Sequence, residues 1–234
     1  MRRSALGNLL RACSKAFAAP WSTAQNREKS LDHKEQSLFN GAAIRRYTGD
    51  KINKQASGAQ MMIFFRERLA VLAVPKTGTS SLEKALDPKA SATFRGPPQL
   101  KHTRAREFET NFRSLFEKKG LPPIETMAVM REPIQWLGSW FRYRQRPSLQ
   151  GHPKSTAGVS FNDFVAAYLT EGRPAYANIA QQADFITDKN GALLVDHLYS
   201  YSDLPAALQF LEKRLQQTIT LPLVNKSPQK ASQD

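Results

Sequence analysis

The chain has 234 residues, with 34 Lys and Arg against 20 Asp and Glu, and its formal net charge is +14. This length suffices for one α/β domain with a sizeable core, and no apolar run approaches the length of a membrane span. The basic balance favours an anionic cofactor, an anionic acceptor, nucleic acid or an acidic membrane surface as partner, and does not choose among them.

Residues 1–60 differ in composition from the rest. They hold 11 Lys and Arg and 4 Asp and Glu, so their net charge of +7 is half of the total +14. The first 20 residues are free of acid and could form an amphipathic targeting or membrane-surface helix, but we favour a flexible basic extension. We expect the folded domain at 61–234, with Met61 and Met62 just before its first strand. The single cysteine, Cys13, excludes an intrachain disulfide and favours a reducing, cytoplasmic location.

The stretch 69–86 predicts a strand, a turn and a helix. Its apolar start, residues 69–74, suits a buried strand, and a loop of small residues follows from Pro75. Leu82 and Leu86 then have helical spacing. The amide groups of such a loop and of the first helical turn lack internal partners and point the same way, which suits an anion.

The side chains of this loop fit an anion as well. Gly78 lets the backbone approach a ligand closely, and Lys76 adds a full positive charge. Hydroxyl donors are expected from Thr77, Thr79, Ser80 and Ser81. The alternative is a turn rich in Ser and Thr that caps an ordinary helix.

A second strand-to-helix junction follows at 126–144. Residues 126–130 are apolar enough for a buried strand, and Pro133 suits the first position of a helix. Arg131, at the strand exit, and Ser139, two turns into the helix, could bind one phosphate together. The alternative for Arg131 is a surface ion pair with Glu132 or another carboxylate.

These two junctions resemble the sulfotransferases that use 3′-phosphoadenosine-5′-phosphosulfate (PAPS). The string PKTGTSSL, residues 75–82, resembles their 5′-phosphosulfate loop, with Ser80 where that family often has Thr. The spacing of Arg131, Pro133 and Ser139 resembles their 3′-phosphate motif. A nucleotide-triphosphate loop would need its Lys after a second Gly, whereas Lys76 precedes the one Gly here.

Lys101-His102-Thr103 stands before a predicted helix at 104–116, for which Thr103 is a plausible N-cap. It resembles a region of some carbohydrate sulfotransferases in which His acts as the catalytic base. Sulfuryl transfer to an alcohol needs a base near the attacking oxygen, and His suits that role at neutral pH. A capping or packing histidine is the alternative.

The remaining elements are predicted from local patterns. We expect a short strand at 90–95, a helix at 161–169 capped by Ser160, and a helix at 204–215 capped by Ser202. Residues 184–201 predict a β-hairpin with its turn at 188–191. The Asn225-Lys226-Ser227 tail resembles a segment near the cofactor in some sulfotransferases. Ser202 departs from that family, which often has an acid after the aromatic at this point.

Strands that alternate with helices predict a three-layer α/β fold with a mainly parallel central sheet. The resemblance implies the P-loop-like sulfotransferase type and in-line transfer from PAPS to a hydroxyl acceptor, such as one on a glycan. In that mechanism Lys76 stabilises the leaving phosphate oxygen, and His102 takes the proton of the acceptor. No metal is expected, because no Cys and His cluster has ligand spacing.

Three other classes remain open. One is a small-molecule kinase with an atypical phosphate loop, which the place of Lys76 disfavours. Another is a nucleic-acid-binding protein, for which neither a reader motif nor a basic-aromatic stripe is present. The third is a non-catalytic module that binds PAPS or another polyanion.

Overall fold

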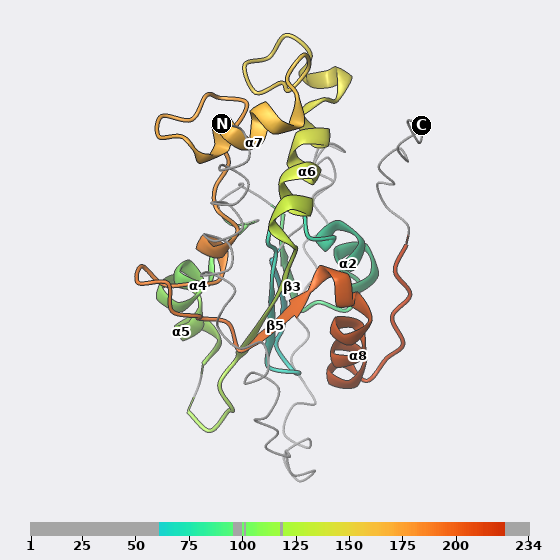
Figure 1. Cartoon of the computed structure of the whole chain (residues 1–234). Coiled ribbons are helices and arrows are strands. Elements are labelled where there is room, and N and C mark those ends of the chain that lie inside the picture. Colours follow the sequence, from blue (N-terminus) through green and yellow to red (C-terminus); the bar gives the residue numbers. More distant parts are fainter. Residues whose placement is uncertain (1–60, 96–99, 101, 118, 223–234) are drawn as a thin grey trace, which may run out of the picture.

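The computed structural model describes residues 61–95, 100, 102–117 and 119–222, and the account below concerns these (Figure 1). The expected extension 1–60, Lys101 and the tail segment 225–227 lie outside them. The described part has an α/β fold around a five-stranded mixed sheet of order β3-β1-β2-β4-β5. Its strands are listed here: β1 Met61–Phe64, β2 Leu69–Leu72, β3 Ala92–Phe94, β4 Glu125–Met130 and β5 His197–Ser200.

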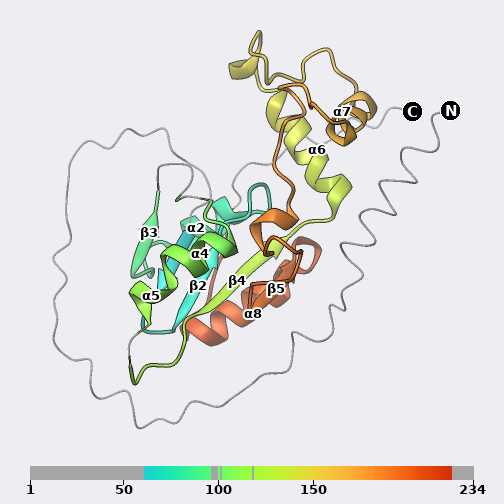
Figure 2. The ribbon, with the colours of Figure 1, turned by 90° about the vertical axis from the view of Figure 1, so that its left-hand side faces the viewer.

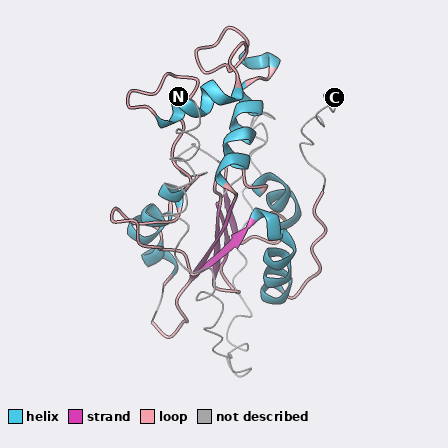
Figure 3. Cartoon of the chain, in the orientation of Figure 1, coloured by secondary structure: helices cyan, strands magenta, loops and turns pink. Residues whose placement is uncertain are grey.

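Helices cover both faces of this sheet, because successive strand residues point to opposite sides (Figures 1 and 3). On one face Ile63, Leu72 and Ala128 pack with α4 (Ala105–Asn111) and α5 (Arg113–Phe116). On the other face Val71 and Val129 pack with α2 (Thr79–Leu86) and α8 (Leu204–Leu215). The sheet therefore lies between two helical layers.

The sheet is less parallel than the sequence predicts. β4 pairs in parallel with β2 and with β5, but β1 pairs in antiparallel fashion with both β2 and β3. The expected start of the first strand is also wrong. Met61 and Met62 do not precede the first strand: they begin β1, with 0% and 1% of their surfaces exposed. The mixed sheet results from this added hairpin of β1 and β2.

Two predicted helices have the expected bounds, and their first residues explain why. α6 (Pro133–Arg144) begins after Glu132, whose carboxylate accepts hydrogen bonds from the amides of Ile134 and Gln135. α7 (Phe161–Leu169) begins after Ser160, whose hydroxyl accepts from the amide of Asp163, as expected. Both helices share an aromatic cluster of their own and extend away from the sheet (Figure 2).

Three other expectations need correction. The helix expected at 104–116 is interrupted at Phe112. Its N-cap is Arg104 and not Thr103, because the hydroxyl of Thr103 donates to the carbonyl of Leu100 instead. The N-cap of α8 is Asp203, whose carboxylate accepts from the amide of Ala206, and Ser202 lies within a 3₁₀ turn, η4 (Tyr201–Asp203).

The hairpin predicted at 184–201 is largely absent. The turn at 188–191 forms, with the Asp188 carboxylate accepting from the amides of Asn190 and Ala192, but only Thr187 and Leu193 make a β-bridge across it. The segment before it contains a 3₁₀ turn, η3 (Ala183–Phe185). β5 instead pairs in parallel with the buried strand β4. Two further elements, η2 (Pro147–Leu149) and α7, lie in the region after α6.

Candidate functional site

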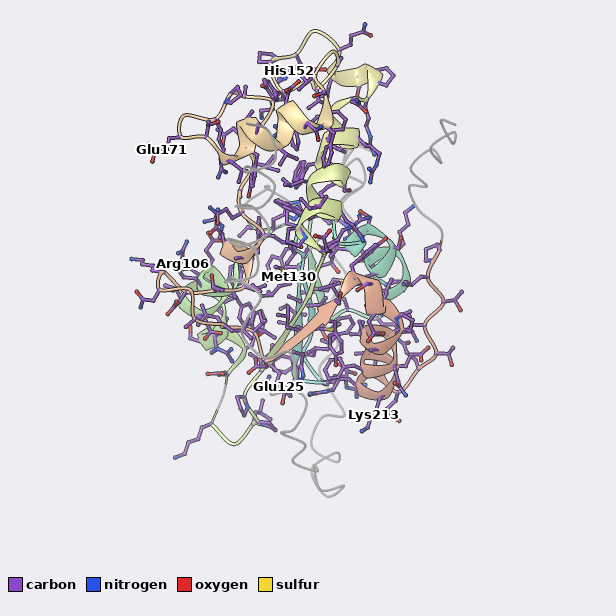
Figure 4. The ribbon with its side chains drawn as sticks, viewed as in Figure 1. Arg106, Glu125, Met130, His152, Glu171 and Lys213 are labelled. Atoms are coloured by element: carbon purple, nitrogen blue, oxygen red, sulfur yellow. The ribbon has the colours of Figure 1, made fainter. Side chains whose placement is uncertain are left out.

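The two sequence motifs meet at one edge of the sheet. β2, β4 and β5 are mutually parallel, so their carboxyl ends lie together. The loop with Lys76 follows β2, Arg131 follows β4, and Tyr201 follows β5. Met130, the last residue of β4, is labelled in Figure 4 just below the start of α6. The predicted phosphate-binding residues of both motifs are therefore neighbours in the fold.

The loop after β2 is held in an unusual backbone conformation. Lys76 and Gly78 both have positive φ, 69° and 78°, which is a strained state for the lysine. Alternating left-handed residues in a short loop turn successive amide groups toward a common concavity that suits an anion. The indole N–H of Trp136 donates to the carbonyl of Pro75 over 2.8 Å, and this buried bond fastens the loop to α6. The strain at Lys76 is thus maintained by contacts from the neighbouring helix.

Not every predicted hydroxyl donor faces outward. Thr77 is fully buried, and its hydroxyl donates to the carbonyl of Val74 over 2.9 Å. The hydroxyl of Thr79, 5% exposed, points to the same carbonyl at 3.5 Å. Ser80 and Ser81 are half-buried. The two threonines therefore stabilise the loop through their side chains, and for the two serines the role of hydroxyl donors stays a prediction.

The first turn of α2 provides backbone donors at the same place. The amides of Ser81 and Leu82 donate to the carbonyl of Gly78, over 3.0 and 3.4 Å. The amides of Gly78, Thr79 and Ser80 precede these, and the helix itself offers them no acceptor. They lie at the positive end of the helix dipole, so an anion bound here would be favoured.

Lys76 lies among aromatic and cationic side chains. Its amine is 4.3 Å from the ring centre of Tyr143 and 5.8 Å from that of Trp140, both on α6. The pKa of Lys76 is lowered from 10.5 to about 8, first by burial of the amine and then by three positive charges, those of Arg146, Arg131 and Arg142. No carboxylate is among the causes of this shift. A bound anion would offset both effects.

Arg131 is held by its backbone and by its side chain. Its amide donates to the side-chain oxygen of Gln182 over 2.7 Å, and its carbonyl accepts from the Gln182 amide nitrogen over 2.8 Å. The guanidinium lies 4.6 Å from the ring centre of Tyr201. Burial is the main reason that the pKa of Arg131 is lowered, and Arg142 adds to the effect. Its Nε atom is buried and has no hydrogen-bond partner in the described part of the chain, so it is a donor that an anion could satisfy.

Tyr201 connects the two motifs. Besides its contact with Arg131, its ring lies directly against Gly78, where any side chain would collide with it. The ion pair that the alternative interpretation gives Arg131 is absent: the carboxylate of Glu132 accepts from two amides of α6, and no described salt bridge includes Arg131. Glu132 acts on Arg131 only at longer range.

The remaining predicted residues, Ser139 and His102, have different relations to this group. Ser139 is half-buried on α6, and no hydrogen bond joins it to Arg131 within the described residues. His102 is half-buried, with Nδ1 2.9 Å from the carbonyl oxygen of Ala73. Because a carbonyl only accepts, Nδ1 carries the proton in this arrangement and a neutral ring would have Nε2 as its acceptor. His102 therefore lies beside the start of the Lys76 loop.

Several residues of this site were not predicted as participants: Trp136, Trp140, Tyr143, Arg146, Gln182 and Tyr201. A weak sequence pattern points to Arg146, because it follows residues of the second motif at helical spacing. The residues at this spacing are Ser139, Arg142, Tyr143 and Arg146. Gln182 and Tyr201 reach the site only through the fold. The resemblance at this point of the chain concerns the residue after Tyr201, and no local pattern marks Gln182.

Within the described residues, no group of three or more His, Cys, Asp and Glu side chains could hold a metal ion, and no helix has the length and apolar character needed to cross a membrane. Comparisons with protein-family models, with curated proteins and with solved structures also found no match.

Proposed function

We propose that this protein is a PAPS-dependent sulfotransferase of the P-loop-like type, which transfers a sulfuryl group to a hydroxyl acceptor such as one on a carbohydrate. The observation that carries the proposal is the meeting of the strained Lys76 loop and the partly unpartnered Arg131 at one sheet edge. Gly78 and Arg131, one from each predicted phosphate-binding motif, are 53 residues apart in the sequence, yet both contact Tyr201. A ligand with phosphates at both ends would use both.

The residues present fit such a ligand. The amides at the start of α2, with Ser80 and Ser81, would hold the 5′-phosphosulfate. Arg131 would bind the 3′-phosphate through the guanidinium, and Ser139 would add a hydroxyl from α6. Arg142 increases the positive potential at both Lys76 and Arg131, and Arg146 increases it at Lys76, as their effects on the pKa values of these groups indicate.

The bound donor supplies an activated sulfuryl group, and the side chains stabilise its transfer. The acceptor oxygen forms a bond to sulfur as the bond from sulfur to the phosphate oxygen breaks, and the adenosine bisphosphate leaves. Lys76 and the loop amides stabilise the negative charge that develops on the leaving oxygen. His102 accepts the proton of the acceptor hydroxyl at its Nε2 atom.

Calorimetry with 3′,5′-bisphosphoadenosine, AMP and ATP tests the nucleotide part of the proposal. We expect at least about tenfold tighter binding of the bisphosphate than of AMP, because one charged hydrogen-bonded contact contributes on the order of 2 kcal/mol. Equal affinities would reject the 3′-phosphate assignment, and a preference for ATP would favour the kinase alternative.

Transfer from labelled PAPS to a panel of glycans and small alcohols tests the chemistry. Lys76→Met should keep most of the bisphosphate affinity and lose most of the transfer rate. His102→Ala should keep the affinity and lose about 100-fold in rate. Tight binding of the bisphosphate without transfer to any acceptor would favour a non-catalytic PAPS-binding module. Unchanged transfer by the His102 variant would leave that residue with a packing role.

A further inference from the structure

Gln182 makes a paired hydrogen bond to the backbone of Arg131 at the end of β4. The side-chain oxygen accepts from the Arg131 amide at 2.7 Å, and the side-chain nitrogen donates to the Arg131 carbonyl at 2.8 Å. Gln182 is only 7% exposed, and it comes 51 residues later in the chain, just before η3. One side chain thus satisfies both backbone groups of the arginine.

This pair takes the place of a neighbouring strand. The parallel pairing of β4 with β5 ends at Met130 and Ser200, and the chain after Ser200 turns into η4. The pairing of β4 with β2 ends earlier, at Ala128 and Leu72. Arg131 is therefore the first residue after β4, where neither neighbouring strand is paired any longer, and the side-chain amide of Gln182 continues the backbone hydrogen bonding by one residue. Few side chains could do this, because the site needs a donor and an acceptor together.

We infer that Gln182 is a positioning residue that sets the selectivity of the site for a second phosphate on the nucleotide. The inference rests on the proposed function. The guanidinium of Arg131 faces Tyr201, and its Nε atom is buried without a partner within the described residues. A fixed backbone directs that donor to one place, and a backbone free to turn would let it move away. Both polar atoms of the Gln182 side chain are engaged with the Arg131 backbone, so Gln182 acts through that arginine.

The test is a set of matched variants measured by calorimetry with two ligands. Gln182→Met keeps the length of the side chain and removes both hydrogen bonds. Gln181→Met serves as the control. Gln181 is the exposed neighbour, and its described hydrogen bond is made by its backbone amide, which the substitution leaves in place. We expect Gln182→Met to weaken 3′,5′-bisphosphoadenosine about tenfold and AMP less than twofold, while Gln181→Met weakens neither.

Two further measurements separate positioning from general stability. Gln182→Glu is isosteric and keeps the acceptor for the Arg131 amide but loses the donor, so it should also reduce the preference for the bisphosphate, even if Gln182→Met fails to fold. In an Arg131→Ala background, Gln182→Met should leave the ratio of the two affinities unchanged, because the group that it positions is gone.

The outcomes distinguish this inference from the proposed function. A wild-type protein without preference for the bisphosphate overturns both. A wild-type preference that Gln182→Met leaves intact, or an equal loss for both nucleotides, overturns the role of Gln182 alone. If Gln182→Met lowered the ratio of bisphosphate to AMP affinity further in the Arg131→Ala background, the role of Gln182 would also be rejected, because Gln182 would then act through another residue.

Discussion

The ring of Tyr201 lies so close to Gly78 that a methyl group on the glycine would come within 2.6 Å of the ring atom Cε2. The loop after β2 and the end of β5 are therefore packed without room for a side chain. Gly78 also has φ of 78°, a conformation that other residues adopt at a cost. Two separate reasons thus require glycine at this point.

The first prediction separates these two reasons. Gly158 has almost the same φ, 77°, but a methyl group there would meet nothing within 4 Å. Gly158→Ala should lower the free energy of unfolding by about 1 kcal/mol, the cost of the left-handed backbone. Gly78→Ala should cost at least about 1 kcal/mol more, because the ring must move. Urea unfolding measures both, and equal losses would show that Tyr201 moves aside freely.

The second prediction concerns the pH dependence of stability at Lys76. The pKa of Lys76 is about 8 in the folded protein against 10.5 ordinarily, so between these values the unfolded chain binds more protons. The unfolding free energy should therefore rise with pH over this window, relative to Lys76→Met, and the difference should be constant below pH 8. In Arg146→Gln the rise should begin at higher pH, since one charge that lowers the pKa is gone. A difference that stays level from pH 7 to pH 10 would contradict the buried position of the amine.

Local sequence patterns predict those parts of the site whose signals are short in range. The strand, loop and helix around Lys76 and those around Arg131 are confirmed because apolar runs, a glycine and a proline mark them. The sequence also contains a pattern for β1, because residues 61–64 and 69–72 are apolar runs on either side of a polar turn. This pattern indicates a strand at 61–64 only when the two runs are considered together as a hairpin. The parallel partner of β5 could not be predicted, because strand pairing across 70 residues leaves no local pattern. The contact between Gln182 and Arg131 could not be predicted for the same reason, because the two residues are 51 positions apart.

The third prediction concerns the buried Arg144 at the end of α6. Its guanidinium, in a side chain that is largely buried, donates to the carbonyls of Ala175, Tyr176 and Asn178 over 2.6 to 3.1 Å. Arg144→Met should lower the unfolding free energy by about 3 kcal/mol, because three buried acceptors lose a charged donor. Arg142→Met, at an exposed position on the same helix, is the control and should change it by less than about 0.5 kcal/mol. Comparable losses would mean that other contacts hold the segment 175–178.

The fourth prediction concerns the opposite end of β4, where Glu125 is labelled in Figure 4. Its carboxylate accepts from His197 over 2.7 Å and from Arg214, and these bonds, led by that of His197, lower the pKa of Glu125. A lowered pKa adds stability above the ordinary value and loses it as pH falls through the folded value. Glu125→Gln should therefore reduce the unfolding free energy at pH 7 and should approach the wild type at pH 3.

The control for this prediction is Glu171→Gln, at an exposed site beyond α7 that Figure 4 also labels. Its unfolding free energy should follow that of the wild type at each pH. A Glu125→Gln difference that persists unchanged to pH 3 would show that the interaction depends on shape, without a contribution from charge.

The strand order has a consequence for the way the chain folds. β1 and β2 are joined by four residues and can pair early, whereas β4 and β5 must close a segment of nearly 70 residues. Lys76 lies just after the early hairpin, but Tyr201 and Gln182 arrive only with the late pairing. A folding intermediate that contains the hairpin and α2 would thus have the loop sequence without its binding geometry. We expect ligand binding to appear only in the last kinetic phase of refolding, so that a bound anion would slow unfolding and leave the first steps of folding unchanged.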